Sequence, residues 1–233
     1  MYSHSARFYD NLYAFRDYTS AADEILTLVG ERAPEAKTLL DVGCGTGRHL
    51  EAFSSHFRVE GLDLNADLLA VARGRLPGVP LHELDMTRFE LHRHFDVIIC
   101  LFSSIGYVKS LMNMRMAVDR MARHLAPGGV IVIEPWFTPE RFWTDTITAN
   151  FVDEPELKIA WMYVSKRRDR LSILDIHYMV ATREGVEEFS EIHEIGLFTE
   201  EEYLDAMTSA GLTGAHFRDG FSGRGLYVGQ RPE

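Results

Sequence analysis

The chain has 233 residues and a formal net charge of −11, with 46% apolar and 25% charged residues. This composition is typical of a globular α/β protein with one insertion and excludes a disordered chain. The acidic balance argues against a nucleic-acid partner, which needs a basic surface, and favours a small-molecule substrate.

The cysteine count and the lack of long apolar runs indicate the cellular compartment in which the protein is expected. Only Cys44 and Cys100 occur, both in apolar contexts, so a disulfide framework is not expected and a reducing compartment fits. Residues 1–10 show no signal-peptide pattern, and no apolar run is long enough to span a membrane. The sequence therefore predicts a soluble, cytoplasmic protein without a membrane partner.

The first eighteen residues are rich in aromatic side chains. They include Tyr2, Phe8, Tyr9, Tyr13, Phe15 and Tyr18. One interpretation is an apolar clamp onto the domain, and the other is a lid from which Tyr13 and Tyr18 reach a ligand. Thr19 can then cap a helix that runs to Ala33.

The segment from Leu39 to Gly47 (LLDVGCGTG) organises the rest of the chain. Its apolar start predicts a buried strand, its glycines a tight turn, and the following residues, 48–53, a helix. Glycine permits unusual backbone angles in such a turn and lets a ligand approach the backbone closely. The sequence predicts a nucleotide-type cradle here.

The spacing of this turn decides which ligand it suits. A dinucleotide fingerprint needs a third glycine where Arg48 stands, and a P-loop needs a lysine that is absent after Gly47. Asp41, at the strand end, favours a ligand with a cationic end. The segment resembles motif I of class I S-adenosylmethionine (SAM) methyltransferases, and SAM carries an ammonium and a sulfonium. The alternative is a glycine-rich turn without a ligand.

Two acids stand at the ends of the next two predicted strands. The strand from Arg58 to Leu62 ends at Asp63, where an acid can accept hydrogen bonds from ribose hydroxyls. Asn65 caps the next helix. The third strand, 79–84, ends at Asp85, whose carboxylate can accept a hydrogen bond from the amino group of adenine. The alternative is that both acids are ordinary turn or cap residues.

The later strands direct their loops to the same edge. The apolar run 95–101 predicts a central parallel strand followed by the loop from Phe102 to Tyr107. A helix over 110–125, closed by Pro-Gly-Gly, and a strand over 130–134 come next, and Trp136 follows that strand. Ligands bind at the carboxyl ends of strands in such sheets, so both loops should face the substrate.

Residues 144–197 break the alternation of strand and helix. Their β-branched and aromatic stretches predict three or four antiparallel strands inserted before the last helix. That helix, 200–210, starts at a capping box of Thr199 and Glu202, and two strands close the fold. The link between those strands, 220–225, is glycine-rich and carries Arg224.

Four further segments are distinctive: FSSIGY (102–107), EPW (134–136), the stretch SEIH to LF (190–198) and SGRGL (222–226). Together they resemble a narrower group, the N-methyltransferases that dimethylate TDP-linked amino sugars in macrolide biosynthesis. The resemblance covers nearly the whole chain and implies an inserted β-layer that covers the active site and joins two subunits. Two departures, the short 13–18 loop and Phe137 in place of a second Trp, lie near the expected acceptor pocket.

The sequence thus predicts an α/β, Rossmann-like class I methyltransferase with three segments, 1–143, 144–197 and 198–233. SAM is the expected cofactor, a nucleotide sugar the expected acceptor, a homodimer the expected assembly, and no metal site is expected. The predicted cofactor contacts are Tyr18, Asp41, Gly43, Cys44, Gly45, Asp63, Leu64, Asp85, Met86 and Leu101. The predicted acceptor contacts are Tyr13, Ser104, Trp136, His177 and Arg224, with Tyr107 as the catalytic candidate.

The role of Tyr107 is expected to be positioning, because a phenol with a pKa near 10 is a poor base at neutral pH. His177 and His193 are the alternative bases from the insertion. Two rival functions remain open: methylation of another small amine, hydroxyl or carboxylate, and a SAM-binding module without catalysis.

Overall fold

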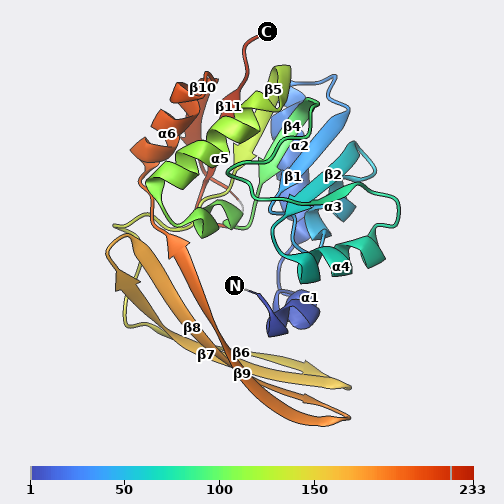
Figure 1. The fold of residues 1–233 in the computed structure, drawn as a ribbon, viewed down its shortest axis with the longest axis vertical. Helices are drawn as coiled ribbons and strands as arrows, with labels where there is room; N and C mark the ends of the chain where they lie inside the picture. Colours follow the sequence, from blue (N-terminus) through green and yellow to red (C-terminus); the bar gives the residue numbers. More distant parts are fainter. Residues whose placement is uncertain (1, 221) are drawn as a thin grey trace.

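A computed structural model describes residues 2–220 and 222–233, so Phe221 in the predicted glycine-rich link lies outside the described residues. A seven-stranded sheet stands above a separate four-stranded antiparallel sheet, and the N-terminal helical segment lies between them (Figure 1). The predicted α/β architecture with an antiparallel layer inserted before the last helix is confirmed.

The helices and strands follow the predicted order. The helices are η1 (His4–Phe8), α1 (Tyr9–Leu12), α2 (Tyr18–Arg32), α3 (Arg48–Phe53), α4 (Ala66–Arg75), η2 (Ser104–Val108), α5 (Leu111–Arg123) and α6 (Glu200–Ser209). The strands of the larger sheet are β1 (Thr38–Val42), β2 (Arg58–Asp63), β3 (Leu81–Glu83), β4 (Phe95–Cys100), β5 (Leu125–Ile133), β10 (Thr213–Arg218) and β11 (Leu226–Gln230). The smaller sheet holds β6 (Ile147–Glu154), β7 (Leu157–Arg168), β8 (Leu171–Thr182) and β9 (Gly185–Gly196).

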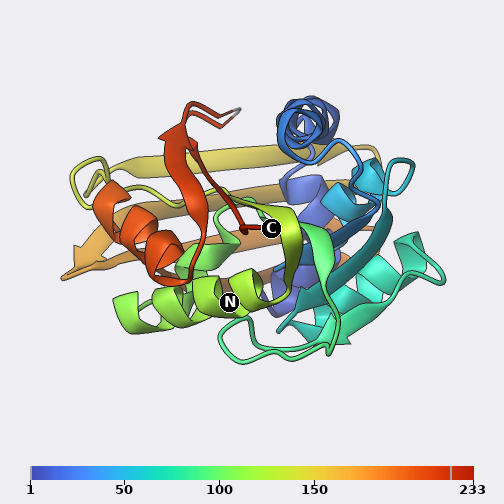
Figure 2. The same ribbon diagram turned by 90° about the horizontal axis from the view of Figure 1, so that it is seen from above.

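The larger sheet has the strand order β10-β11-β5-β4-β1-β2-β3, in which β1 to β5 are parallel and β11 runs antiparallel to both of its neighbours, β5 and β10. Helices lie on both of its faces (Figure 2). One apolar cluster joins α2, α3 and α4 to the sheet, and another joins α5 and α6 to it. The central strands are buried on both sides, which explains their nearly continuous apolar sequence.

Three predicted boundaries were wrong. Helix α2 is capped by Asp17, whose carboxylate accepts from Ser20 N, so Thr19 lies inside its first turn. Strand β5 starts at Leu125, because the Pro-Gly-Gly stretch continues into the sheet with a register shift against β4. Strand β3 has three residues, 81–83. By contrast, the predicted capping box of Thr199 and Glu202 is present at α6.

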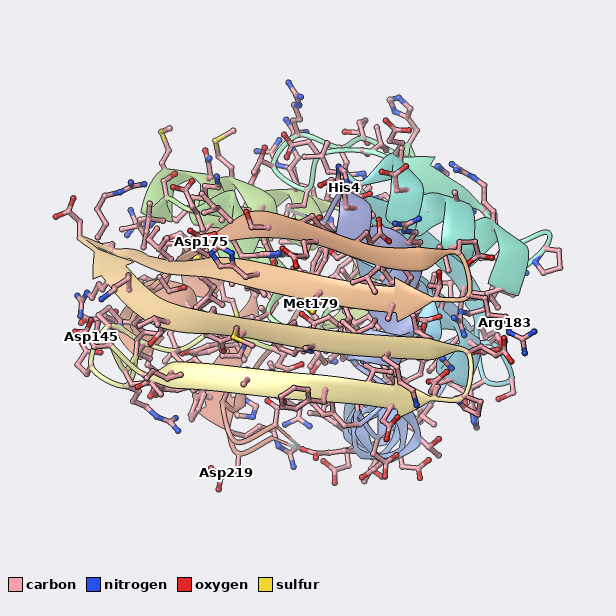
Figure 3. The ribbon with its side chains drawn as sticks, turned by 90° about the horizontal axis from the view of Figure 1, so that it is seen from below. His4, Asp145, Asp175, Met179, Arg183 and Asp219 are labelled. Carbon is pink, nitrogen blue, oxygen red and sulfur yellow. The ribbon has the colours of Figure 1, made fainter. Side chains whose placement is uncertain are left out.

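The antiparallel sheet, seen from below in Figure 3, has the strand order β6-β7-β8-β9. Its inner face contributes Ile159, Trp161, Ile176 and Tyr178 to an apolar cluster with Phe8. All four strands lie within residues 144–197, and the division of the chain into segments at 143 and 197 stays a prediction. None of the helices among the described residues is long and apolar enough to cross a membrane.

Candidate active site between the two sheets

A cavity of about 520 Å³ lies between the carboxyl ends of the parallel strands and the inner face of the antiparallel sheet. This volume is within the usual range of small-molecule sites. The wall toward the parallel sheet includes Gly43, Gly45, Asp63, Leu64, Asn65, Asp85, Met86, Phe102 and Ser104. The facing wall includes Trp161, Tyr163, Leu174, Ile176, His193 and Ile195 from the antiparallel sheet. Tyr107 and Trp136, from the loops after β4 and β5, also line the cavity, and the N-terminal segment adds Tyr2, Tyr9 and Tyr13.

The glycine turn after β1 forms the floor of the cradle. Gly43 and Gly45 have φ of +80° and +55°, where side chains other than glycine are strained. A Cβ on Gly43 would come within 2.6 Å of the Ser104 Cβ, whereas a Cβ on Gly45 would meet nothing within 4 Å. Gly45 therefore borders open space in which a ligand can approach the backbone.

The acids at the ends of β2 and β3 both line the cavity. The Asp63 carboxylate accepts hydrogen bonds from Gly45 N at 2.9 Å and Asn65 N at 2.8 Å. Burial raises the pKa of Asp63, and these backbone hydrogen bonds oppose the rise. Asp85 accepts from the backbone N and the hydroxyl of Thr87, at 2.8 and 2.7 Å. Each acid is thus held at the cavity by a backbone N–H of its own loop, and Asp63 also by the glycine turn after β1.

Asp41 lies beneath the cradle rather than on the cavity wall. Its side chain is buried, and Oδ2 has no hydrogen-bond partner. Burial, and secondarily the charge of Asp63, raises the pKa of Asp41 to about 8. An unpartnered buried carboxyl beside an open cradle fits a ligand with a cationic group, because such a ligand would favour the ionised form. The buried carboxyl of Asp41 and the open glycine turn therefore fit SAM, which carries an ammonium and a sulfonium.

The N-terminal segment forms part of the cavity and also packs on the antiparallel sheet. Tyr13 lies edge-on to Phe102, with ring centroids 5.0 Å apart, and its hydroxyl is 3.0 Å from that of Tyr2. Phe8 and Leu12 belong to the apolar cluster of the antiparallel sheet. The segment therefore combines the position expected of a lid with the packing expected of a clamp.

Tyr107 and Trp136 face the cavity with fixed side chains. The Tyr107 hydroxyl lies 2.8 Å from His193 Nδ1, and burial raises the pKa of Tyr107 far above its usual value. The Trp136 indole N–H donates to the Ser172 hydroxyl at 2.9 Å. Ser104 donates to the Gly43 carbonyl at 3.1 Å. With its raised pKa, Tyr107 is suited to orient a ligand and poorly suited to act alone as a base.

Several predicted site residues lie away from the cavity wall. The side chains of Cys44 and Leu101 are buried in the apolar cluster on the α2 side of the sheet. Tyr18 packs against His49, with ring centroids 5.0 Å apart. The predicted acceptor contact His177 also lies away from the cavity wall. Alternation along β8 turns Ile176 inward and leaves the His177 side chain 68% exposed on the outer face.

Arg224 also lies behind the wall instead of on it. Its guanidinium pairs with the buried Glu134 and donates to the Pro135 carbonyl, and it lies 5.7 Å from the Trp136 ring centroid. Arg16 approaches the same Glu134 oxygen at 4.0 Å and stacks on Phe102. Two guanidinium groups thus share one carboxylate.

Sequence reasoning missed part of the acceptor wall, notably Trp161, Tyr163, Leu174 and Ile176. The alternation of apolar and polar residues along β7 and β8 was visible in the sequence. Which of the two faces points into the cavity depends on how the antiparallel sheet packs against distant parts of the chain. The residues that the structure describes include no group of three or more His, Cys, Asp or Glu side chains placed to hold a metal ion.

Comparisons with known proteins agree with this geometry. A family model described as a methyltransferase domain matches residues 39–129. The chain is 44% identical to the dTDP-3-amino-3,4,6-trideoxy-alpha-D-glucopyranose N,N-dimethyltransferase of Streptomyces venezuelae, over 95% of both chains. It is 40% identical to the dTDP-4-amino-2,3,4,6-tetradeoxy-D-glucose N,N-dimethyltransferase of Saccharopolyspora spinosa, over 97% of this chain and 92% of that one.

Solved structures give the same picture. The crystal structure of Streptomyces venezuelae DesVI superimposes with a TM-score of 0.93 at 42% identity and full coverage of both chains. A SAM-bound amino pentose methyltransferase from Micromonospora echinaspora, involved in calicheamicin biosynthesis, superimposes with a TM-score of 0.88 at 38% identity, covering 99% of this chain and 98% of that one.

Proposed function

The chain belongs to the family of SAM-dependent N,N-dimethyltransferases of TDP-linked amino sugars, and we propose that it methylates the amine of such a sugar in the cavity between its two sheets. The observation that carries this proposal is the juxtaposition of two walls. A glycine cradle with strand-end acids faces an aromatic wall, and binding of SAM by itself would not require that second wall.

We propose that Gly43, Gly45 and Asp63 hold the methionine and ribose parts of SAM, and that Asp85 and Met86 hold the adenine. When bound, SAM supplies a methyl group that its sulfonium already activates. The chain's own contribution is to align the acceptor nitrogen with that methyl group and to exclude water. Such alignment can account for roughly 7–11 kcal/mol of barrier reduction.

The acceptor contacts are proposed to be Tyr13, Ser104, Tyr107 and Trp136. We propose that Arg224 attracts the diphosphate of the nucleotide sugar through its charge, from its position behind the cavity wall. The support is electrostatic, because Arg16 and Arg224 share one carboxylate and leave an excess positive charge beside Trp136. A free amino sugar should then be a much poorer substrate than its nucleotide form.

A homodimer is also part of the proposal. The outer face of the antiparallel sheet exposes Phe151, Met162, Val164 and Met179, with exposed fractions of 71%, 47%, 40% and 49%. Register places them on one face, around the position of Met179 in Figure 3. An apolar patch of this kind marks an interaction surface. Met162→Glu should convert a dimer to monomers in sedimentation analysis, and an unchanged sedimentation coefficient would argue against this interface.

A cytoplasmic location completes the proposal. Both cysteines, Cys44 and Cys100, are buried free thiols, which is compatible with a reducing compartment.

The direct test is turnover. The purified chain is incubated with SAM and with dTDP-linked 3-amino and 4-amino deoxysugars, and S-adenosylhomocysteine and methylated sugar are measured by mass spectrometry. We expect S-adenosylhomocysteine to form in step with the addition of first one and then two methyl groups. The corresponding free amino sugars serve as the control. SAM binding without turnover of any of these sugars would instead favour a non-catalytic module or a different acceptor.

A further inference from the structure

A chain of buried polar contacts links the cavity to the N-terminal segment. The Tyr107 hydroxyl lies 2.8 Å from Nδ1 of His193, and Nε2 of the same imidazole lies 3.7 Å from the Glu191 carboxylate. That carboxylate accepts from the backbone N and hydroxyl of Ser3, at 2.8 and 2.9 Å, and from the backbone N and hydroxyl of Ser5. Tyr107, His193 and Glu191 thus form a line that ends on residues 3–5.

The protonation states along this line follow from burial and charge. Burial lowers the pKa of His193 despite the opposing charge of Glu191, so the imidazole is neutral at neutral pH. Burial alone would raise the pKa of Glu191, but its contacts with His193, Ser5 and Ser3 hold it well below its usual range. Glu191 is therefore a carboxylate and accepts hydrogen bonds without donating any.

The carboxylate selects one tautomer of His193. An unprotonated Nε2 would direct its lone pair at the Glu191 oxygen, whereas an Nε2–H directs a positive hydrogen there. The neutral ring therefore carries its proton on Nε2, although 3.7 Å is too long for a hydrogen bond. Nδ1 is then an acceptor, and the Tyr107 hydroxyl must donate to it.

We propose that this fixed donation makes Tyr107 a selective acceptor of N–H groups from the substrate, a proposal that rests on the methyltransferase function above. With its hydrogen committed to His193, the phenol oxygen can only accept hydrogen bonds, from Tyr2 beside it and from a ligand in the cavity. A neutral amine can donate one N–H to that oxygen and keep its own lone pair free. His193 and Glu191 are positioning residues, and Tyr107 is the residue that touches the acceptor.

The orientation matters because of the reaction's electron flow. The nitrogen lone pair forms the new C–N bond while the electrons of the broken S–C bond remain on sulfur, and the resulting ammonium loses a proton to solvent. A phenol free to rotate could donate its hydrogen to the nitrogen lone pair and block the attack. Holding the hydrogen on His193 removes that competing geometry.

The N-terminal segment completes the arrangement. Four donors from Ser3 and Ser5 hold Glu191, and the Tyr2 ring lies edge-on to His193 with centroids 4.7 Å apart. On the other side, Asn65 donates its side-chain amide to the Tyr2 carbonyl. The same segment therefore contacts the cofactor wall and the acceptor-positioning line.

The test compares three variants of the whole enzyme. His193→Leu removes the acceptor for the Tyr107 hydrogen, His193→Asn keeps a side-chain oxygen near the place of Nδ1, and His56→Leu makes the same kind of change at an exposed loop position. For His193→Leu we expect kcat to fall about tenfold to a hundredfold, because a buried donor loses its partner, with a much smaller change in KM. His193→Asn should recover most of kcat, and His56→Leu should behave as the parent.

Nitrogen NMR of the imidazole provides a readout that does not need turnover. The parent should show His193 as the neutral Nε2–H tautomer, and the Nδ1 signal should shift in Tyr107→Phe. The double variant Ser3→Ala/Ser5→Ala should broaden or shift the same signals. The opposite tautomer, or equal kcat for the His193→Leu variant and the parent, would overturn the inference. Failure of the parent to methylate any amino sugar would contradict the proposed function. The tautomer measurement would still show whether the Tyr107 hydroxyl donates to His193.

Discussion

The two walls of the cavity belong to opposite kinds of sheet. The cofactor wall comes from the loops of a parallel sheet, where backbone atoms and strand-end acids provide the contacts, as with Gly45 N on Asp63. The acceptor wall comes mainly from the pleated face of an antiparallel sheet, where alternate side chains such as Trp161 and Ile176 provide the contacts, and Tyr107 and Trp136 join it from the loops after β4 and β5. One wall is determined by backbone conformation and the other by side-chain identity. The first should be sensitive to single local changes, and the second should set the choice of substrate.

The largest effect is expected at Asp63. Asp63→Ala removes a carboxylate that organises Gly45 and Asn65, and SAM affinity should fall roughly 100-fold or more, about 2.7 kcal/mol. Isothermal titration calorimetry measures the change. The exposed Glu83, opposite Asp63 in the register with β3, gives a matched control as Glu83→Ala. Equal SAM affinity of Asp63→Ala and the parent would remove Asp63 from the cofactor wall.

The next effect tests the acceptor wall. Tyr107→Phe should lower kcat/KM by about one to two orders of magnitude, roughly 1.4–2.8 kcal/mol, while SAM affinity stays unchanged. The pH profile of kcat/KM should keep its shape, because the raised pKa of Tyr107 prevents its ionisation in the accessible range. Complete loss of turnover with normal binding of both ligands would indicate that Tyr107 is an obligatory base.

A smaller effect is expected from the cradle glycine. Gly45→Ala places a methyl group into the open side of the cradle and a non-glycine residue at φ +55°. We expect SAM affinity to weaken roughly tenfold, and the unfolding free energy to fall by about 1–2 kcal/mol. Gly74→Ala, in helix α4 with open space around its Cβ position, is the control and should not destabilise the protein. Thermal unfolding and calorimetry on both variants separate strain from ligand exclusion.

The smallest effect concerns Asp41. With its pKa raised to about 8, the buried carboxyl is mostly protonated at pH 7 and half ionised at pH 8. If the ionised form favours the cation of SAM, SAM affinity should rise about fivefold between pH 7 and 8, with proton release on binding. Asp41→Asn should abolish this rise. Calorimetry in buffers of different ionisation enthalpy measures the released protons, and a pH-independent parent affinity would exclude the coupling.

The cofactor wall was accessible from sequence because its signals are local. Positive-φ glycines, a strand before them and a helix after them occupy one short stretch, and Asp63 and Asp85 each end a recognisable strand. Each of these features depends on residues close by in the chain. The side chains of Cys44 and Leu101 point into the apolar cluster behind the wall, because residue order does not give side-chain direction at a strand end.

The acceptor wall was less accessible because its contacts join distant residues. Tyr107 meets His193 across 86 positions, and Ser5 meets Glu191 across 186. The alternation of β8 was visible, but the choice of His177 over Ile176 as the inward residue depended on which face the sheet turned to the cavity. Arg224 was identified as a significant arginine, yet its pairing with Glu134 could not be derived from spacing alone.

The most direct test of the division between the walls is a crystal structure with S-adenosylhomocysteine and a dTDP-linked amino sugar bound together. We predict the adenosyl group against Asp63 and Asp85, and the sugar amine within hydrogen-bond distance of the Tyr107 oxygen, on the side facing Trp161 and Ile176. A sugar bound outside the cavity, or an adenosyl group against the antiparallel sheet, would contradict the assignment of the two walls.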